Sequence, residues 1–531
     1  MDRRHLLAEL AKPRTWDVAI IGGGATGLGV ALDAAARGYS VVLVESDDFA
    51  KGTSSRATKL VHGGVRYLAQ GNIALVREAL HERTTLLANA PHLAQPLAFV
   101  VPAYRWFDVG LYGAGLKAYD VLAGKAGLGA TEILARASDV LHLLPTAQPR
   151  GLKGGVKYWD GQFDDARLAL ALARTAASRG ALVVNYCAAT GLVHRDGKVA
   201  GLVCADRETG ATFELAAKCV INAAGVWVDQ FRQQDGDAIG RAVRPMVAPS
   251  QGVHVVVDRD FLPGRHALMV PKTADGRVLF GVPWLGKVIL GTTDTPRHDL
   301  PREPLPFPQE LEFILSEAGK YLARPPKRED IRSVWVGLRP LVKPQGEDGE
   351  DTKALSREHT VLVSRAGLVT VTGGKWTTYR AMAEDVLAKC MEKGLLARTS
   401  AGVTTNLRLA GAPLPGSDVP SIAEPQGLHS YGTEAGAVLE MPGARRELAP
   451  GLTEGMVRYA GRTEYARTVE DVLARRCRML FLDARKAGAL APAVGAILRE
   501  ETGADPHVAA FQELARQYAE PKMQGDKYVQ S

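Results

Sequence analysis

Short apolar runs and a helix-forming stretch alternate at the start of the chain. Asp17–Ile21 and Tyr39–Val44 are mostly apolar, which is typical of strands buried in a parallel sheet. Between them, Ala25–Arg37 has the composition of a helix, and Gly38 supplies a stop. This order predicts a strand–helix–strand unit.

The alternation continues downstream. Helices are predicted over Ile73–Ala90 and Asp164–Gly180. Short strands are predicted after the second helix, near Ala181–Tyr186, Leu192–Val193, Val199–Cys204 and Lys218–Ile221. Four further strands, separated by turn residues, predict a mixed or antiparallel sheet in a second, substrate-covering domain: Val253–Val257, Ala267–Val270, Val278–Val282 and Val288–Gly291.

The last part of the chain has helical periodicity. It follows Gly411–Pro420, which has the composition of a linker, and the periodic segments are Met456–Tyr459, Val469–Ala487 and Ala491–Glu500. With 531 residues the chain is too long for one ordinary core. We expect a discontinuous dinucleotide-binding domain (15–90, 150–240 and 330–395), a substrate-binding cap (91–149 and 241–329) and a helical C-terminal domain (411–531).

One predicted helix mixes apolar and basic side chains. Val100–Gly129 combines Arg105, Lys117 and Lys125 with aromatic and leucine residues. A helix through it would carry an apolar face with basic edges, as interfacial membrane anchors do. An ordinary core helix with a solvated basic edge explains the pattern equally well. Lys343–Lys353, by contrast, is a charged loop with nothing to bury.

Composition indicates a globular protein with 46% hydrophobic and 23% charged residues. The formal net charge of +7 is a mild basic excess that favours anionic substrates or an anionic membrane surface. No nucleic-acid motif accompanies it. The five cysteines are scattered without a C-x-x-C pair, which argues against a disulfide framework or a metal site and fits a reducing cytoplasm. Neither a signal peptide nor a membrane-spanning apolar run is predicted.

Glycines follow the first predicted strand in the G-x-G-x-x-G spacing. Gly22 allows a tight turn, Gly24 lets a pyrophosphate approach the backbone, and Gly27 lets the helix pack on the strand. Glu45 ends the second strand eighteen residues after Gly27, where a carboxylate binds ribose hydroxyls. The pattern predicts a dinucleotide site that includes Ala25 and Thr26, and it leaves the kind of dinucleotide open.

A second segment rich in hydroxyls and glycines, Thr53–Leu68, follows closely. His62, Arg66 and Tyr67 offer a base, a cation and a phenol. A surface loop with a solvated arginine is the alternative. Small residues after the strand at Lys218–Ile221 also permit close approach to a flat ligand. We expect further cofactor contacts from Thr53, Ser54, Ser55, Lys59, Leu60, His62, Gly63, Gly64, Ala224 and Gly225.

Candidate substrate groups come from the second half of the chain. His254 is placed at the start of a strand, where a histidine is more often structural than catalytic. Thr292 and Thr293 are hydroxyl donors, and a cap on the next turn is a sufficient explanation for Asp294. Arg339 lies on an apolar segment and requires an anion, either a ligand or an internal carboxylate.

The segment GGKWTTYR at 373–380 ends a predicted strand at Leu368–Thr372 and begins a helix near Thr377. Glycines at a helix start expose N–H groups and the positive end of the helix dipole. Gly374, Lys375 and Thr377 are therefore expected to contact the electron-rich edge of a ring system.

Together these segments resemble the flavin-dependent glycerol-3-phosphate dehydrogenases. The matching motifs span roughly residues 17–390 and read IGGGATGLGVALDAAARG, SSRATKLVHGGVRYL, DDARLAL, NAAGVWVD, GTTD, GLRPL and GGKWTTYR. Residues 470–487 are similar to the family's C-terminal helical cap. Leu28 and Trp376 depart from the family pattern, and Trp376 is expected to reshape the wall near the flavin.

The resemblance implies an α/β fold. Its first part is a FAD-binding Rossmann-type domain, like that of glutathione reductase and D-amino-acid oxidase. The other parts are a mixed-sheet substrate domain and the C-terminal helices. It also implies FAD and oxidation of sn-glycerol 3-phosphate to dihydroxyacetone phosphate, with hydride passing from C2 to flavin N5. The base would be His62 or, second, His254. Arg339 and Lys375, helped by Arg66, would bind the phosphate, and Tyr67, Thr292 and Thr293 the remaining oxygens.

The implied electron acceptor is a membrane quinone. A cytoplasmic protein bound peripherally to the inner face of the cell membrane is therefore expected, with Val100–Gly129 as a candidate surface. An oxygen-using glycerol-3-phosphate oxidase has the same substrate motifs and stays an alternative. An amino-acid or sarcosine-type oxidase, or a flavin-bearing sensor, leaves the basic residues unexplained. The oligomeric state, including a homodimer, stays open.

Overall fold

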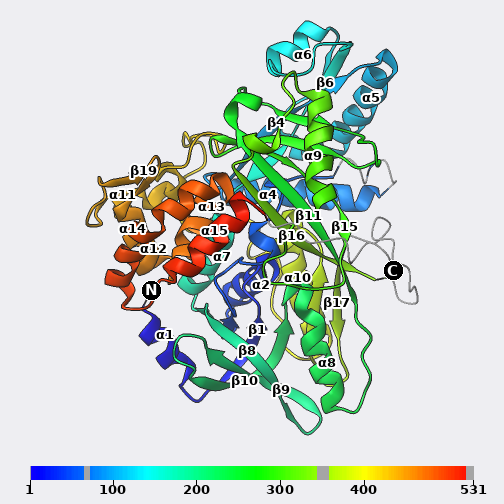
Figure 1. Cartoon of the computed structure of the whole chain (residues 1–531). Helices are drawn as coiled ribbons and strands as arrows, with labels where there is room; N and C mark the ends of the chain where they lie inside the picture. The colour runs from blue at the N-terminus through cyan, green and yellow to red at the C-terminus, as the bar shows by residue number, and fades with distance from the viewer. Residues whose placement is uncertain (1, 65–67, 69–71, 344–357, 522–531) are drawn as a thin grey trace.

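Two large β-sheets and a group of C-terminal helices organise the chain. The computed structural model describes residues 2–64, 68, 72–343 and 358–521. In Figure 1 the N-terminal sheet lies below the second sheet, and the C-terminal helices pack at one side of their junction. The interpretation as an α/β fold with a mixed-sheet domain and a helical C-terminal domain is confirmed.

The first sheet has a parallel centre with the strand order β18–β10–β1–β2–β7. Helix α2 (Ala25–Ala36) connects β1 to β2, so the predicted strand–helix–strand unit is confirmed. The strands of this sheet are β1 (Thr15–Ile21), β2 (Val41–Val44), β7 (Leu182–Val184), β8 (Cys187–Arg195), β9 (Lys198–Asp206), β10 (Thr212–Asn222), β17 (His359–Val363) and β18 (Val369–Gly373). All four residues of β2 are buried, as befits a strand covered on both faces.

Helices pack around this sheet. Their apolar side chains and those of the sheet form one continuous core. The helices that accompany it are α1 (Arg3–Leu10), α4 (Ile73–Asn89), α7 (Asp165–Ser178), α8 (Val228–Ala238) and α10 (Tyr379–Glu392). The predicted helices at 73–90 and 164–180 are thus present as α4 and α7.

The second sheet is mixed, as its predicted strands indicated. Its order is β15–β11–β14–β13–β12–β4–β6–β3, with β16 on β11 and β5 on β6. The strands are β3 (Leu60–Val61), β4 (Ala94–Ala103), β5 (Glu132–Leu134), β6 (Gly154–Phe163), β11 (Val247–Asp258), β12 (Ala267–Val270), β13 (Leu279–Trp284), β14 (Lys287–Gly291), β15 (Thr295–Pro296) and β16 (Ser333–Val342). The helices α5 (Trp106–Ala123), α6 (Ala137–Leu143) and α9 (Pro308–Tyr321) accompany this sheet.

The two sheets divide the chain differently from the expected domain ranges. Strands β6 and β16 lie within ranges expected for the first domain, yet they pair with β4 and β11 of the second sheet. His254 also differs from expectation, because it lies in the middle of the twelve-residue strand β11 and not at its start. Both differences arise because ladder pairing is a tertiary property that local periodicity does not contain.

The C-terminal helices are α11 (Ala435–Leu439), α12 (Glu454–Thr463), α13 (Met479–Leu482), α14 (Ala484–Thr502) and α15 (Val508–Ala519). The segment with helical periodicity at Val469–Ala487 forms several helical pieces and not one continuous helix. A π-helical segment at Asp471–Arg476 ends at Cys477, and Arg478 has a left-handed backbone with φ of 58°. Burial of Arg478 explains the break, because its guanidinium reaches the Ser55 carbonyl oxygen, 2.7 Å away in the first domain.

Candidate functional site

The carboxyl end of β1 opens on a cavity that the glycine loop lines. Gly22 has φ of +107°, and a side-chain carbon there would lie 2.6 Å from the Ala223 carbonyl oxygen. Gly24 is the N-cap of α2 and gives the helix no side-chain cap. The Ala25 N–H donates to Ser54 Oγ at 2.9 Å, and the positive end of the helix dipole beside it favours an anion such as a pyrophosphate.

Glu45, at the end of β2, lies beside this loop. Its carboxylate accepts N–H bonds from Gly23 (2.6 Å) and Asp47 (2.9 Å). Burial raises the pKa of Glu45, and these two N–H bonds oppose the rise by stabilising the anion. The carboxylate thus lines the cavity at the position where a ribose is expected.

Two cavities run end to end between the sheets. The dinucleotide cavity, of about 260 Å³, is lined by the glycine loop, Glu45, Ala224, Gly225 and Trp227. The substrate cavity, of about 320 Å³, lies against the second sheet. Six residues line both: Thr53, Pro340, Gly373, Gly374, Lys375 and Trp376. A long ligand that fills the first cavity therefore ends at the wall of the second.

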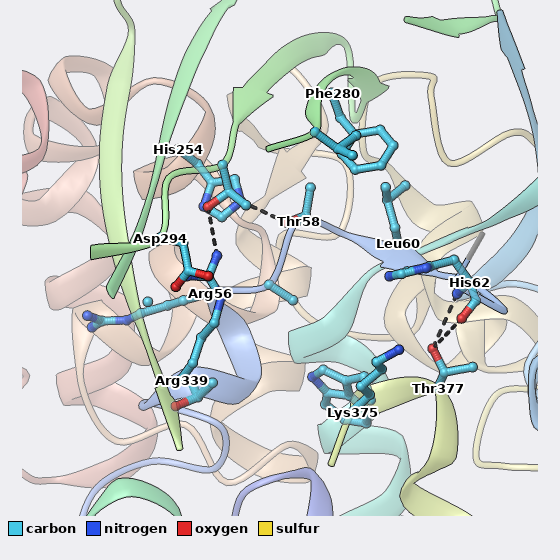
Figure 2. A pocket seen from close by; sticks show the side chains of 18 of the residues that line it. Arg56, Thr58, Leu60, His62, His254, Phe280, Asp294, Arg339, Lys375 and Thr377 are labelled. Carbon is cyan, nitrogen blue, oxygen red and sulfur yellow. Dashed lines mark hydrogen bonds and ion pairs between the residues drawn. The ribbon is translucent and has the colours of Figure 1, made fainter. Parts of the chain in front are cut away.

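Arg339 on β16 forms one side of the substrate cavity (Figure 2). Its guanidinium donates to Thr292 Oγ1 (3.1 Å) and to the Thr293 carbonyl oxygen (2.9 Å), and it pairs with Asp294 at 3.1 Å. The sequence left open whether Arg339 pairs with a ligand or with an internal carboxylate, and Asp294 is such an internal carboxylate. The Arg339 side chain keeps 21% of its surface exposed, so it remains accessible from the cavity.

His254 is a buried imidazole on the same side. Its Nε2 lies 2.9 Å from Thr58 Oγ1, and its ring stacks on Trp335 with centroids 5.2 Å apart. Burial, together with the positive charges of Lys59 and Arg339, holds the pKa of His254 well below its usual range. The imidazole is therefore neutral at pH 7, which is the form that accepts a proton.

His62 lies on the opposite side of the substrate cavity, next to Thr377 and Lys375 in Figure 2. The backbone N–H of His62 donates to Thr377 Oγ1 at 3.2 Å. This bond connects the segment after β3 to the turn that precedes α10. Leu60, Gly64 and Thr53 line the same cavity. The structure therefore brings both candidate bases to one cavity, from different walls.

Several expected cofactor residues lie elsewhere. The Lys59 side chain is fully buried and pairs with Asp165 at 2.7 Å, so it does not line either cavity. Ser55 is buried as well, while Gly27 and Gly63 allow close packing, since a side-chain carbon there would collide with Gly22 and Tyr119. Arg66 and Tyr67 lie outside the described residues, as does most of the loop at 343–353.

Comparison with known proteins decides the family. A family model described as FAD dependent oxidoreductase matches residues 17–380, and one described as the C-terminal domain of alpha-glycerophosphate oxidase matches residues 402–509. The mitochondrial glycerol-3-phosphate dehydrogenase SDP6 of Arabidopsis thaliana is 40% identical over 91% of this chain and 82% of its own length. The human mitochondrial glycerol-3-phosphate dehydrogenase is 38% identical over 97% of this chain and 75% of its own. The chain belongs to the FAD-dependent glycerol-3-phosphate dehydrogenases.

A solved structure of this family has the same fold. The glycerol-3-phosphate dehydrogenase of Bacillus halodurans, determined in complex with FAD, has a TM-score of 0.77 and 30% identity, with 99% of each chain covered. The cavities of the present chain fit this cofactor. The start of α2 suits the pyrophosphate and Glu45 suits the ribose. The shared wall at Gly373–Trp376 is where the other end of an extended FAD reaches.

Trp376 of the present chain belongs to that shared wall, at a position where the family commonly has leucine. Its Nε1–H donates to the Ser54 carbonyl oxygen at 2.8 Å, and its ring meets Phe163 edge-on at 5.6 Å. The larger residue thus fixes the segment after Gly52 to the start of α10. The expectation that Trp376 shapes the wall agrees with this placement.

Sequence reasoning missed several residues that line the substrate cavity. They are Arg56, Thr58, Asp160, Arg277 and Phe280. Arg56 and Thr58 lie within Thr53–Leu68, the segment rich in hydroxyls and glycines that is predicted to contact the cofactor. Their place in this segment was a signal that they also line a ligand cavity. Arg277 follows a turn between two strands, where a solvated arginine is the ordinary interpretation, and no local pattern distinguishes it.

Proposed function

We propose that this protein oxidises sn-glycerol 3-phosphate to dihydroxyacetone phosphate and transfers the electrons to a membrane quinone. The charge of the substrate cavity carries the proposal. Among the described residues, four basic side chains and two carboxylates line it: Arg56, Arg277, Arg339 and Lys375 against Asp160 and Asp294. Although Arg56 and Arg277 also pair with carboxylates outside the wall, the lining itself has a positive excess that suits a phosphate monoester.

Within this cavity Arg339 is the principal phosphate ligand. Its guanidinium supplies a permanent positive charge at the cavity wall, and its bonds to Thr292, Thr293 and Asp294 hold it in one orientation. Because these bonds exist before substrate binds, little conformational entropy is lost on binding. Lys375 adds a second cation from the shared wall.

FAD, when bound, supplies the acceptor for the hydride that leaves C2 of the substrate. The chain must then take the C2 hydroxyl proton, and an imidazole is the suitable base near neutral pH. His254 is neutral and is oriented by Thr58 and Trp335. His62 lies on the opposite wall. With the phosphate bound at Arg339, the orientation of the substrate decides whether His254 or His62 lies next to the C2 hydroxyl.

Helix α5 supports the proposed peripheral contact with the inner face of the cell membrane. Its exposed apolar side chains, Trp106, Phe107, Leu111 and Val121, are 55–81% exposed. At about 100° per residue they lie within about 140° of the helix circumference. The exposed cation Arg105 precedes the helix, and the exposed Lys117 lies within the same arc; both favour anionic lipid headgroups. No helix in the described part of the chain is long and apolar enough to cross a membrane.

Anaerobic mixing of the purified holoenzyme with sn-glycerol 3-phosphate tests the reaction. We expect the flavin absorbance near 450 nm to fall after mixing with sn-glycerol 3-phosphate. Glycerol or an α-amino acid should leave this absorbance unchanged. A response to the amino acid and none to the phosphate ester would refute the proposal. Adding oxygen or a soluble quinone to the bleached protein then separates the two acceptors: rapid recolouring by quinone and slow recolouring by oxygen supports a dehydrogenase, and the reverse supports an oxidase.

A further inference from the structure

A segment of the second sheet's domain crosses the adenosine end of the dinucleotide cavity. Residues Arg297–Glu303 follow β15, and we call them the strap. Trp227, which lines the dinucleotide cavity, donates its indole N–H to the Leu300 carbonyl oxygen at 3.2 Å. This bond joins the strap to the turn after β10 in the first domain.

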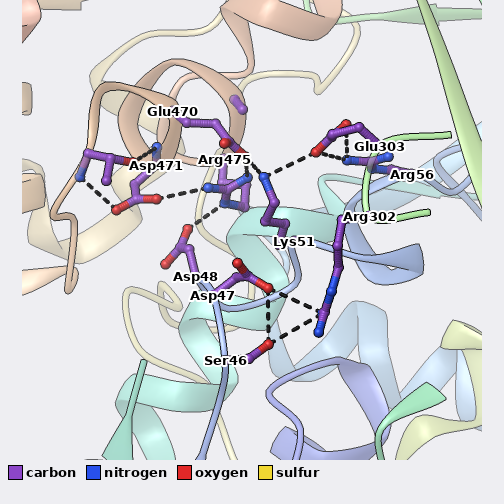
Figure 3. A network of polar contacts seen from close by, with 12 residues as sticks. Ser46, Asp47, Asp48, Lys51, Arg56, Arg302, Glu303, Glu470, Asp471 and Arg475 are labelled. Atoms are coloured by element: carbon purple, nitrogen blue, oxygen red, sulfur yellow. Dashed lines mark hydrogen bonds and ion pairs between the residues drawn. The ribbon is translucent and has the colours of Figure 1, made fainter. Parts of the chain in front are cut away.

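Arg302 makes the next connection. Its guanidinium lies over the Trp227 ring, with 4.4 Å from Cζ to the ring centroid. On its other side it pairs with Asp47 at 3.2 Å and donates to Ser46 Oγ at 3.4 Å (Figure 3). Arg302 thus spans from the turn after β10 to the segment that follows β2.

The partners of Arg302 belong to the site that holds the ribose. Ser46 Oγ and the Asp47 N–H both donate to Glu45 Oε1, at 3.1 Å and 2.9 Å. Arg302, Ser46, Asp47 and Trp227 all line the dinucleotide cavity. The guanidinium is therefore part of the cavity wall beside the expected ribose, and not a distant surface charge.

The far end of the strap is anchored by buried charges. Glu303 accepts from Arg56 at 2.8 Å and pairs with Lys51 at 3.1 Å. Lys51 in turn pairs with Glu470 of the C-terminal domain at 2.6 Å (Figure 3). With Leu300 and Glu303 fixed on either side, Arg302 is held at the mouth of the cavity.

We propose that Arg302, with Trp227, is a cofactor-binding element which the substrate domain supplies to FAD. The pair closes the adenosine end of the cavity, and Arg302 contacts the dinucleotide there through its planar cation. A guanidinium stacked on an indole and paired with an aspartate offers both a flat surface for a base and N–H donors for ribose or phosphate oxygens. This proposed contact between Arg302 and FAD does not depend on which substrate the enzyme oxidises.

The test is the rate at which FAD leaves the holoenzyme after dilution into flavin-free buffer without substrate, measured as flavin that passes an ultrafiltration membrane. Arg302→Ala should release FAD about tenfold faster than the wild type, because the proposed contact between the guanidinium and the dinucleotide is lost. Asp47→Asn, which keeps Arg302 and weakens its pairing, should give a smaller acceleration. Release at the wild-type rate from Arg302→Ala would overturn the proposal.

Arg324→Ala is a matched control. Arg324 lies in the same domain over the Phe261 ring at 3.9 Å and pairs with Asp260 at 2.7 Å. Its side chain is 59% exposed, against 55% for Arg302, and it lines neither cavity. It should release FAD at the wild-type rate. Equal acceleration in both variants would mean that any loss of a stacked arginine loosens the domain, and would also refute a specific role for Arg302.

Discussion

His254 Nε2 and Thr58 Oγ1 lie 2.9 Å apart in the substrate cavity wall, although 196 positions separate them in the chain. Thr58 precedes β3, whereas His254 is central in β11. The bond fixes the ring plane together with the stacked Trp335. An imidazole held in this way, and kept neutral by burial, is prepared to accept a proton from a substrate hydroxyl.

The pH dependence of flavin reduction tests His254 as the base. The pKa of His254 lies well below its usual range, so His254 stays neutral as the pH falls from 8 to 6. If it is the base, the anaerobic reduction rate should stay nearly constant over this interval. A base with the ordinary histidine pKa of about 6.5 would lose half its rate at that pH.

Substitution of each histidine completes this test. Replacing the base by asparagine should slow flavin reduction by about 10²-fold or more, since general-base catalysis contributes about that much. His254→Asn and His62→Asn should differ clearly, with the larger effect in the variant whose wild-type residue explains the pH profile. Two variants with unchanged reduction rates would place the base elsewhere.

Arg339→Ala should raise KM for sn-glycerol 3-phosphate about 10–100-fold, because hydrogen bonds to a charged group contribute about 1.5–3 kcal/mol. Steady-state kinetics with a soluble quinone measure it. Arg339→Lys keeps the charge and loses the fork, so an intermediate KM is expected. Arg324→Ala, which removes an arginine remote from both cavities, should leave KM unchanged. An unchanged KM in Arg339→Ala would remove this residue from the phosphate site.

Lys59→Met tests the structural role of Lys59. The Lys59 amino group is fully buried between Asp165 and the rings of Trp284, Trp335 and Phe481. Burial lowers its pKa to about 7, so the charged pair with Asp165 is best measured near pH 6. Removing the amino group leaves the Asp165 carboxylate buried with weaker compensation, so the free energy of unfolding should fall by about 3–5 kcal/mol in denaturant titrations. Lys389→Met, in an exposed pair with Glu392, should change it by less than about 0.5 kcal/mol. Equal small changes would contradict the buried-pair account.

The triple variant Trp106→Ala, Phe107→Ala, Leu111→Ala should bind anionic vesicles at least about tenfold more weakly than the wild type in sedimentation assays. These side chains supply apolar area that would enter the headgroup region, at roughly 1.5–3 kcal/mol for each one fully buried. The control is Leu414→Ala with Leu439→Ala, which removes exposed leucines (65% and 51%) from the C-terminal part. Weaker binding in the control alone would move the membrane surface away from α5.

Local spacing was sufficient to predict that Gly22, Gly24 and Glu45 line one cavity. Gly22, Gly24 and Glu45 act within one strand–helix–strand unit, so their chemistry is readable without tertiary information. Arg339 was recognised as needing an anion, but its partner Asp294 lies 45 residues away and depends on how β16 meets β11. Only the folded chain could settle that alternative.

Other errors have the same origin. Lys59 lies inside a cofactor motif, yet its side chain points to Asp165, because a residue's facing direction depends on the pairing of β3 with β6. Arg302 has no local signal at all, since its partners Trp227 and Asp47 are 75 and 255 positions earlier. The break at Arg478 was missed because helical periodicity continues through it, while the buried contact to Ser55 that favours the break is tertiary.

The strap has a practical consequence for protein engineering. Exchanging the substrate domain for that of a relative, to alter which alcohol is oxidised, would also exchange Arg302 and the anchor at Glu303. A chimera could then recognise its new substrate and still lose its yellow colour during purification. Designers of such hybrids should carry Trp227, Asp47 and residues 297–303 as one set.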